Sequence, residues 1–100
     1  MKIYLSGAIT GITGYKEHFD RIEKALIAAG HEVINPAVVN DPLPPSTTHK
    51  EYMHVSFALL DLCDTIFMLD GWDKSNGARQ EFEYAARHRK TIAFEGSNYG

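Results

Sequence analysis

The sequence has little cysteine and no long apolar runs, and each absence excludes or disfavours a class of protein. Cys63 is the only cysteine among the 100 residues, so an intramolecular disulfide is excluded. Its place after Leu62 in an apolar segment suits a small core residue. Ser6 and Gly7 interrupt the apolar run at the N-terminus. We therefore expect neither a signal peptide nor a membrane span, and we expect a cytoplasmic protein.

Clustered basic charge is also missing. The chain has 10 Lys and Arg against 13 Asp and Glu, a net charge of −3, and no run of Lys or Arg longer than two. A face for duplex nucleic acid is therefore not expected. His49 and His54 are five residues apart, which does not place two metal ligands on one helix face. We interpret both as surface or loop-facing histidines, and we expect no metal and no cofactor.

Alternating strand and helix patterns fill the rest of the chain, which has the size and composition of one domain over residues 1–100. Strands are expected at about 2–6, 31–35, 65–69 and 91–94, and helices at about 15–29, 49–62 and 76–88. The proline-rich segment 40–48 is expected to be a loop, and the polar tail from Glu95 to be loose. This order predicts a three-layer α/β domain of Rossmann or flavodoxin-like type, with a four-stranded parallel sheet in the order 2-1-3-4.

Helix patterning suggests which side chains face the sheet. The inward stripe of helix 76–88 is expected to be Ala78, Phe82 and Ala85, with Glu81 roughly 60° from its centre. The inward stripe of helix 49–62 is expected to consist of Tyr52, Val55 or Ser56, Leu59, Leu60 and Cys63. Thr48 and Glu51 match a capping box at the start of that helix.

The stretch from Ile66 to Ala85 carries the strongest functional signal. A buried strand leads into a polar turn and then into a helix that opens near Gly77, with Glu81 one turn along. Ligands of parallel α/β folds bind at the carboxyl ends of the strands, so a catalytic carboxylate is expected here. A partly desolvated Glu81 fits that role, although a glutamate in the first turn can also simply complement the helix dipole.

Two other features of this sheet edge allow more than one interpretation. Asp70 could be a general base, an acceptor for a sugar hydroxyl or a turn former. It is unlike the phosphoacceptor aspartate of a receiver domain, because that site needs an acidic pair after the first strand and Ser6-Gly7-Ala8 has none. The loop from Gly7 to Gly14 has three glycines in eight residues and could wrap a ligand or form a strand-to-helix turn. It matches neither dinucleotide nor P-loop glycine motifs.

The segments KIYLSGAITG and LDGWDKSNGARQEFEYA resemble the nucleoside 2-deoxyribosyltransferase superfamily, and within it most closely the small DUF4406 proteins of bacteria and phages. The resemblance spans nearly the whole chain in the same element order. It implies N-glycosidic chemistry on a nucleoside or nucleotide, in which the glutamate matching Glu81 attacks the anomeric carbon. The base leaves, and the sugar passes to a second base or to water.

The resemblance also implies roles for other residues. Tyr4 matches a tyrosine near the reacting sugar, and together with Asp70 it would orient and polarise the reacting groups. Ser75 matches a phosphate-contacting serine and favours a 5′-monophosphate. Trp72 could stack on a base, as could Tyr84, or either could serve in packing. The substrate-binding set implied in this way comprises Ser6, Gly7, Ile9, Thr10, Trp72, Ser75, Asn76 and Gly77.

One departure from the family pattern bears on activity. Where the family has an acidic residue that helps protonate the leaving base, this chain has Ser56, and a hydroxyl is a poor general acid. Asp70, Asp61 or His54 could substitute, or turnover could be weak. A non-catalytic nucleotide-binding or sensing module on the same fold is therefore the alternative; nothing in the sequence positively favours a small interaction protein. Short sheet edges suggest a homodimer.

Overall fold

The structure is a computed structural model that describes residues 1–96 of the chain. Its elements, in chain order, are β1 (Lys2–Ser6), α1 (Tyr15–Ala28), β2 (Glu32–Ile34), α2 (Pro36–Val39), α3 (His49–Asp61), β3 (Thr65–Met68), the 3₁₀ turn η1 (Trp72–Lys74), α4 (Asn76–Arg87) and β4 (Thr91–Phe94). The three long helices and four strands expected from the sequence are all present, within two residues at each end.

The four strands form one parallel sheet in the order β2-β1-β3-β4. Tyr4 of β1 pairs with Ile34 of β2 on one side and with Ile66 of β3 on the other. In β3, Thr65 to Met68 are all buried, as expected for a central strand covered on both faces. The predicted strand order and the parallel arrangement are confirmed.

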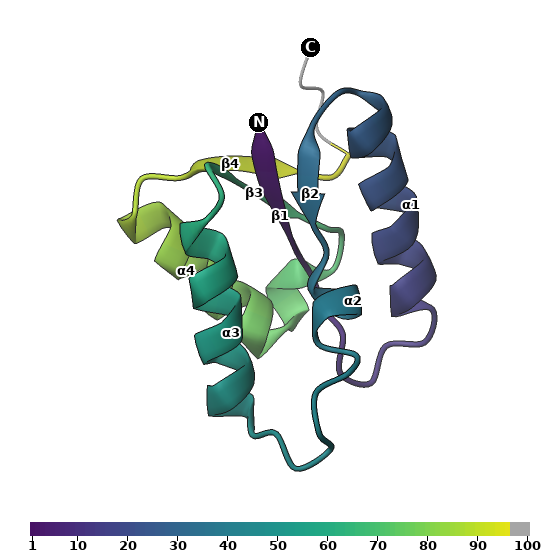
Figure 1. The fold of residues 1–100 in the computed structure, drawn as a ribbon, viewed down its shortest axis with the longest axis vertical. Coiled ribbons are helices and arrows are strands. Elements are labelled where there is room, and N and C mark those ends of the chain that lie inside the picture. Colours follow the sequence, from purple (N-terminus) through teal and green to yellow (C-terminus); the bar gives the residue numbers. More distant parts are fainter. Residues whose placement is uncertain (97–100) are drawn as a thin grey trace.

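Helices cover both faces of the sheet, and Figure 1 shows α1 on one side and α3 with α4 on the other. The core on the α1 and α2 face is built on Ile3, Leu5, Phe19, Ala37, Phe67 and Leu69. The core on the α3 and α4 face is built on Tyr4, Leu60, Cys63, Ile66, Met68, Ala78 and Ala85. Because side chains alternate along a strand, Tyr4 and Ser6 both face α3 and α4.

Two helical stripes differ from the predictions. In α4 the buried residues are Ala78, Glu81 and Ala85, so Glu81 takes the central place that was predicted for Phe82. Phe82 is half-buried instead, because its ring stacks on Trp72 with ring centroids 5.0 Å apart. In α3, Ser56 and Leu60 are buried as predicted, as is Cys63 just after the helix, whereas Met53 is buried where Tyr52 was predicted.

The sequence interpretation missed the short helix α2, which follows β2 directly. Asn35 caps it, accepting a hydrogen bond from the N–H of Ala37 at 2.9 Å, and Pro36 occupies its first turn. Asn followed by Pro is a helix-start signal that was available in the sequence. Segment 40–48 is free of regular helix or strand, as predicted.

The end of the described chain is also held in place. Glu95 accepts hydrogen bonds from the N–H of Asp70 at 2.8 Å and pairs with Nε2 of His18 at 2.7 Å. The prediction of a loose tail is therefore wrong for Glu95, and for residues 97–100 it lies outside the described residues. No helix within residues 1–96 is long and apolar enough to cross a membrane.

Candidate functional site

Glu81 is a buried carboxylate with two short hydrogen bonds. The residue is 7% exposed, and it projects from the first turns of α4 toward the end of β1. The hydroxyl of Tyr4 donates to Oε2 at 2.5 Å, and the hydroxyl of Ser6 donates to Oε1 at 2.6 Å. Such short contacts are typical of hydroxyls that donate to a charged acceptor.

Strand geometry explains why these two donors reach one carboxylate. Tyr4 and Ser6 are two residues apart in β1, so their side chains leave the same face of the sheet. Both are fully buried. They are 77 and 75 residues from Glu81 in sequence, and the packing of α4 against β1 and β3 brings the three residues together.

Burial and hydrogen bonding act on Glu81 in opposite directions. Loss of solvent raises the pKa of Glu81 above its usual value of 4.5, while hydroxyl donation from Ser6, Tyr4 and Ser56 and the proximity of His49 oppose this shift. Burial and the neighbouring carboxylate raise the pKa of Tyr4 well above its usual value, so Tyr4 stays a donor. Three hydroxyl groups therefore surround one carboxyl group at the sheet edge.

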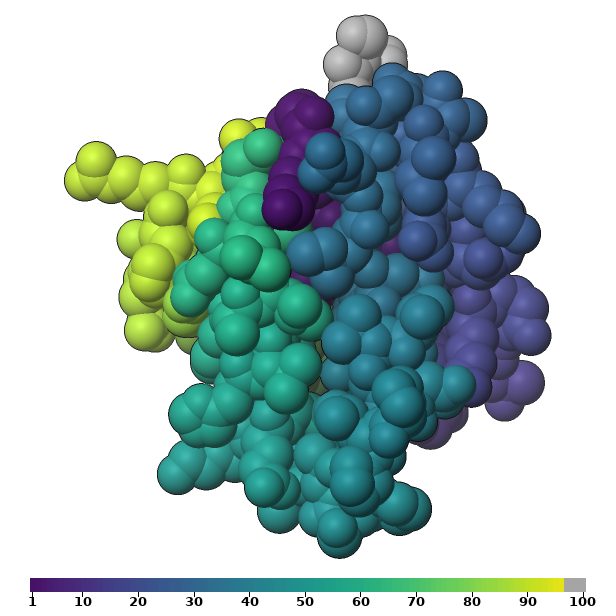
Figure 2. Space-filling model, viewed as in Figure 1, coloured from purple at the N-terminus to yellow at the C-terminus, as the bar shows by residue number. Residues whose placement is uncertain are grey.

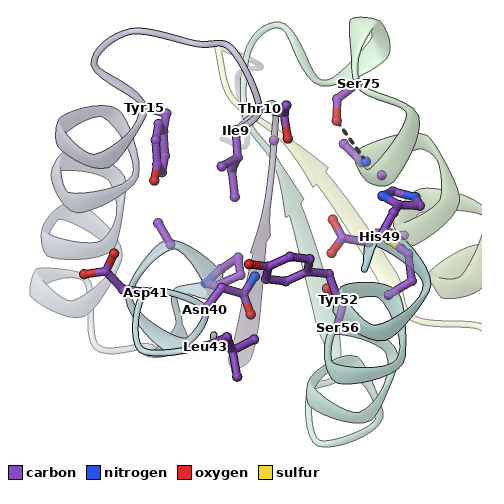
Figure 3. Close-up of a pocket in the computed structure, with 17 residues that line it drawn as sticks. Ile9, Thr10, Tyr15, Asn40, Asp41, Leu43, His49, Tyr52, Ser56 and Ser75 are labelled. Atoms are coloured by element: carbon purple, nitrogen blue, oxygen red, sulfur yellow. Dashed lines mark hydrogen bonds between the residues drawn. The ribbon is translucent and has the colours of Figure 1, made fainter. Parts of the chain in front are cut away.

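A cleft of about 340 Å³ opens over Glu81 between the two halves of the molecule. Figure 3 shows Tyr15, Asp41 and Leu43 on one side and His49, Ser56 and Ser75 on the other, with Tyr52 extending from α3 toward Asn40. In the space-filling view of Figure 2, the connection between α2 and α3 forms the lower end of the molecule. The cleft lies where the parallel strands end, which is the usual ligand position in this architecture.

Several predicted residues line this cleft. Gly7, Ile9 and Thr10 of the loop after β1 contribute to it, as do Ser75 and Gly77 at the start of α4. Ser75 is the N-cap of α4 and accepts from the N–H of Ala78 at 3.2 Å, which leaves its hydroxyl hydrogen free to donate. Tyr4 and Ser6 do not line the cleft, but they hold the Glu81 that does.

Three predicted residues lie elsewhere. Asp70 is exposed and outside the cleft lining, and its backbone N–H bonds Glu95. Trp72 packs with Phe82 and Phe94, the latter at a ring distance of 6.0 Å. Asn76 is exposed and does not line the cleft either. The structure does not bring these side chains to Glu81.

Other cleft residues were not predicted as site residues. Tyr52 was expected to face the core, and it lines the cleft instead. His49 is exposed, as expected, yet it also borders the cleft. The remaining lining residues that were not predicted as site residues are Tyr15, Pro36, Ala37, Asn40, Asp41, Leu43, Met53, Ser56 and Ala78. The proline-rich segment gave no periodic pattern, so its contribution to a binding wall had no sequence signal.

The buried reactive group of the cleft is the Glu81 carboxylate, which is surrounded by hydroxyl donors. No lysine or arginine belongs to the described lining. Within residues 1–96, no three His, Cys, Asp or Glu side chains lie close enough to bind a metal ion. A carboxylate with a face toward a cleft can act as a nucleophile or as a base.

Two solved structures resemble this fold along the whole chain. One is a 2-deoxyribosyltransferase from Bacillus psychrosaccharolyticus, with a TM-score of 0.71 and 21% identity, of which the match covers 77%. The other is a CMP N-glycosidase from Clostridium botulinum, with a TM-score of 0.66 and 19% identity, of which the match covers 75%. At these identities the likeness establishes the fold. No curated protein sequence matches the chain significantly.

The sequence itself matches one family model over almost its full length. This model is DUF4406, a domain of unknown function, and it matches residues 1–94. The strand order and the two structural likenesses confirm the expected fold. The chain therefore belongs to the DUF4406 family and has a nucleoside 2-deoxyribosyltransferase-like fold.

Proposed function

We propose that the protein cleaves or exchanges the N-glycosidic bond of a nucleoside, preferably a 2′-deoxynucleoside or its 5′-monophosphate, with Glu81 as nucleophile. The observation that carries this proposal is the placement of Glu81, which is buried, bonded to two hydroxyls and open to a cleft at the strand ends. The two structural neighbours, a 2-deoxyribosyltransferase and a CMP N-glycosidase, support the same reaction class.

The geometry suits a carboxylate nucleophile. Each carboxylate oxygen has about two lone-pair sites, and Tyr4 and Ser6 occupy one on each oxygen of Glu81. Ser56 also donates to this carboxylate, so at least one lone-pair site remains for the anomeric carbon, while the hydroxyl donors fix the orientation of the group. Attack then gives a glycosyl ester on Glu81, and water or a second base releases the sugar.

The walls of the cleft suggest how the substrate lies. Ser75 and the loop residues Gly7, Ile9 and Thr10 would contact the sugar and its 5′-phosphate, through neutral donors only. The proposal assigns no direct substrate contact to Asp70 or Trp72, because both lie outside the lining. A homodimer located in the cytoplasm remains our expectation, and light scattering of the purified protein would test the dimer.

The alternative is a nucleotide-binding module that performs no chemistry. The observation that favours it is Ser56, which is 4% exposed and faces Glu81 where the family carries an acid. Its hydroxyl cannot protonate a leaving base effectively.

One experiment separates the two functions. The protein is incubated with deoxy- and ribonucleosides and their 5′-monophosphates, free base is measured by liquid chromatography, and Glu81→Gln is the isosteric control. The proposal expects base release by the native protein that the variant lacks. If no base appears above the control while a nucleotide still raises the melting temperature, the protein is a binding module.

A further inference from the structure

Departure of a nucleobase requires a proton as well as a nucleophile. When the C1′–N bond breaks, its electron pair stays on the base, and most bases leave slowly unless that nitrogen, or another on the ring, is protonated. The proton donor must reach the cleft. This question rests on the proposed function, because only a chain that cleaves the bond needs such a donor.

The described lining of the cleft contains five titratable side chains: Tyr15, Asp41, His49, Tyr52 and Glu81. Glu81 is the nucleophile in the proposed reaction. Asp41 is exposed, and its carboxyl group is engaged in an ion pair with Lys16 at 3.0 Å. Phenols ordinarily titrate near pH 10 and are weak acids at neutral pH.

Elimination therefore leaves His49, and imidazole is the side chain that ordinarily gains and loses a proton between pH 5 and 8. The substitutes suggested by the sequence alone do not serve, since His54, Asp61 and Asp70 are all absent from the lining. Asp61 instead accepts a hydrogen bond from the Tyr84 hydroxyl at 2.6 Å.

The position of His49 fits the task. It is the first residue of α3, directly after the Thr48 cap, and seven residues before Ser56, which is about two helical turns along the same face. Its ring lies against the start of α4, where a methyl group placed on Gly77 would be 3.6 Å from Cε1 of His49. Figure 3 shows the ring beside the cleft, on the same side as Ser75 and Ser56.

His49 is also electrostatically coupled to Glu81. A positive imidazolium favours the carboxylate form that attacks the sugar, so one protonation state of this pair prepares both groups for the first step. The buried end of the cleft, next to Glu81, has Ser56 and no acidic group that could protonate the base. His49 supplies such a group from the exposed end of the cleft.

We propose that His49 is the general acid for the leaving base. Glu81 attacks C1′, the C1′–N bond breaks, and the imidazolium of His49 gives its proton to the base, which departs neutral. His49 is then a neutral imidazole and Glu81 carries the glycosyl ester. In the second step the imidazole takes a proton either from water or from the N–H of an incoming base. The water oxygen, or the nitrogen of that base, then attacks C1′ and releases Glu81 as a carboxylate.

The test compares two leaving groups. An unmodified 2′-deoxynucleoside needs a proton, whereas 7-methyl-2′-deoxyguanosine carries a cationic base that leaves neutral without one. We expect His49→Asn to lower kcat/KM by on the order of 100-fold on the unmodified substrate and by less than about 5-fold on the methylated one. His54→Asn is the matched control, because His54 lies on the same helix, is exposed and is outside the cleft.

The outcomes separate the inference from the function beneath it. Equal losses on both substrates would show that His49 does not deliver the proton. The same assay is run on the 5′-monophosphate of the unmodified nucleoside, and a loss confined to this monophosphate would also overturn the inference and make His49 a phosphate ligand. If the native protein cleaves neither substrate, the proposed function itself fails. Melting temperatures of both variants within about 2 °C of the native value would confirm that they fold, as expected for exposed positions.

Discussion

The hydrogen bond from Tyr4 to Glu81 gives the sharpest test of how the site is held. Tyr4→Phe removes one hydroxyl and keeps the ring, so the packing of the fully buried side chain is preserved. What is lost is a 2.5 Å bond to Oε2 of a buried carboxylate. The variant should lose both stability and activity, because the same bond stabilises the charged form of Glu81 and fixes its orientation.

The size of the effect follows from the burial of both partners. A hydrogen bond to a charged group contributes about 1.5–3 kcal/mol to stability. For a domain of this length, each kcal/mol changes the melting temperature by about 4–8 °C. We therefore expect Tyr4→Phe to lower the melting temperature by about 6–24 °C near neutral pH.

The pH dependence has a definite direction. Burial already raises the pKa of Glu81 above 4.5, and loss of the Tyr4 donor raises it further. Where Glu81 is ionised in the native protein, Tyr4→Phe removes a bond to a charge, and the destabilisation is complete. As the pH falls through the raised pKa toward 4.5, the carboxyl becomes neutral and the difference between the two proteins should shrink.

The matched control is Tyr84→Phe. The hydroxyl of Tyr84 also donates to a carboxylate, Asp61 at 2.6 Å, but this bond is exposed to solvent. Its loss should change the free energy of unfolding by about 0.5 kcal/mol or less. Urea denaturation from pH 4 to pH 8 measures both variants. Equal effects of the two substitutions, or a Tyr4→Phe effect that does not vary with pH, would refute the reasoning.

Three further predictions concern the same sheet edge. Glu81→Gln should abolish base release yet stabilise the fold by about 0.5–2 kcal/mol at pH 7. Because burial raises the pKa of Glu81, the stability of the native protein declines as the pH rises above 4.5. In urea titrations, the extra stability of the variant should therefore vanish near pH 4. Gly7→Ala should destabilise by about 1–3 kcal/mol in the same assay, since the new methyl group would lie 3.1 Å from Cβ of Leu69; an unchanged midpoint would contradict this. Ser56→Asp in the His49→Asn background should restore base release by about 10-fold, because it supplies an acid that shares its proton with Glu81; no recovery would indicate that the step is not limited by protonation.

Most of the fold could be predicted because local signals agreed with one another. The run from Thr65 to Met68 is apolar on both faces, the Thr48 and Glu51 capping box forms as expected, and the alternation of elements left few parallel topologies. Helix α2 was missed because its four residues are too few to show a helical period. Its start was nevertheless signalled by Pro36, since a proline ring suits the first turn of a helix.

The site was harder to predict, and Glu81 shows why. Helical periodicity could not decide whether Glu81 or Phe82 faces the sheet, because a rotation of one residue changes the answer. The orientation of the helix depends on Tyr4 and Ser6, which lie at the other end of the chain and bind Glu81. It also depends on Trp72, whose ring stacks on that of Phe82. Such long-range partners leave no trace in local patterning. Tyr52 was misplaced for the same reason.

The reacting group and the facing wall of the cleft come from different parts of the chain, and this has an evolutionary consequence. Glu81 is hydrogen-bonded to two fully buried side chains of β1, in the core of the domain. The facing wall comes from residues such as Tyr15, Asn40 and Leu43, in segments that hold neither Glu81 nor its donors. Substitutions there can alter which ligand is accepted while the reacting group keeps its geometry. Descendants of one ancestral chain could therefore diversify in substrate by changing residues 9–15 and 36–43, with the chemistry inherited unchanged.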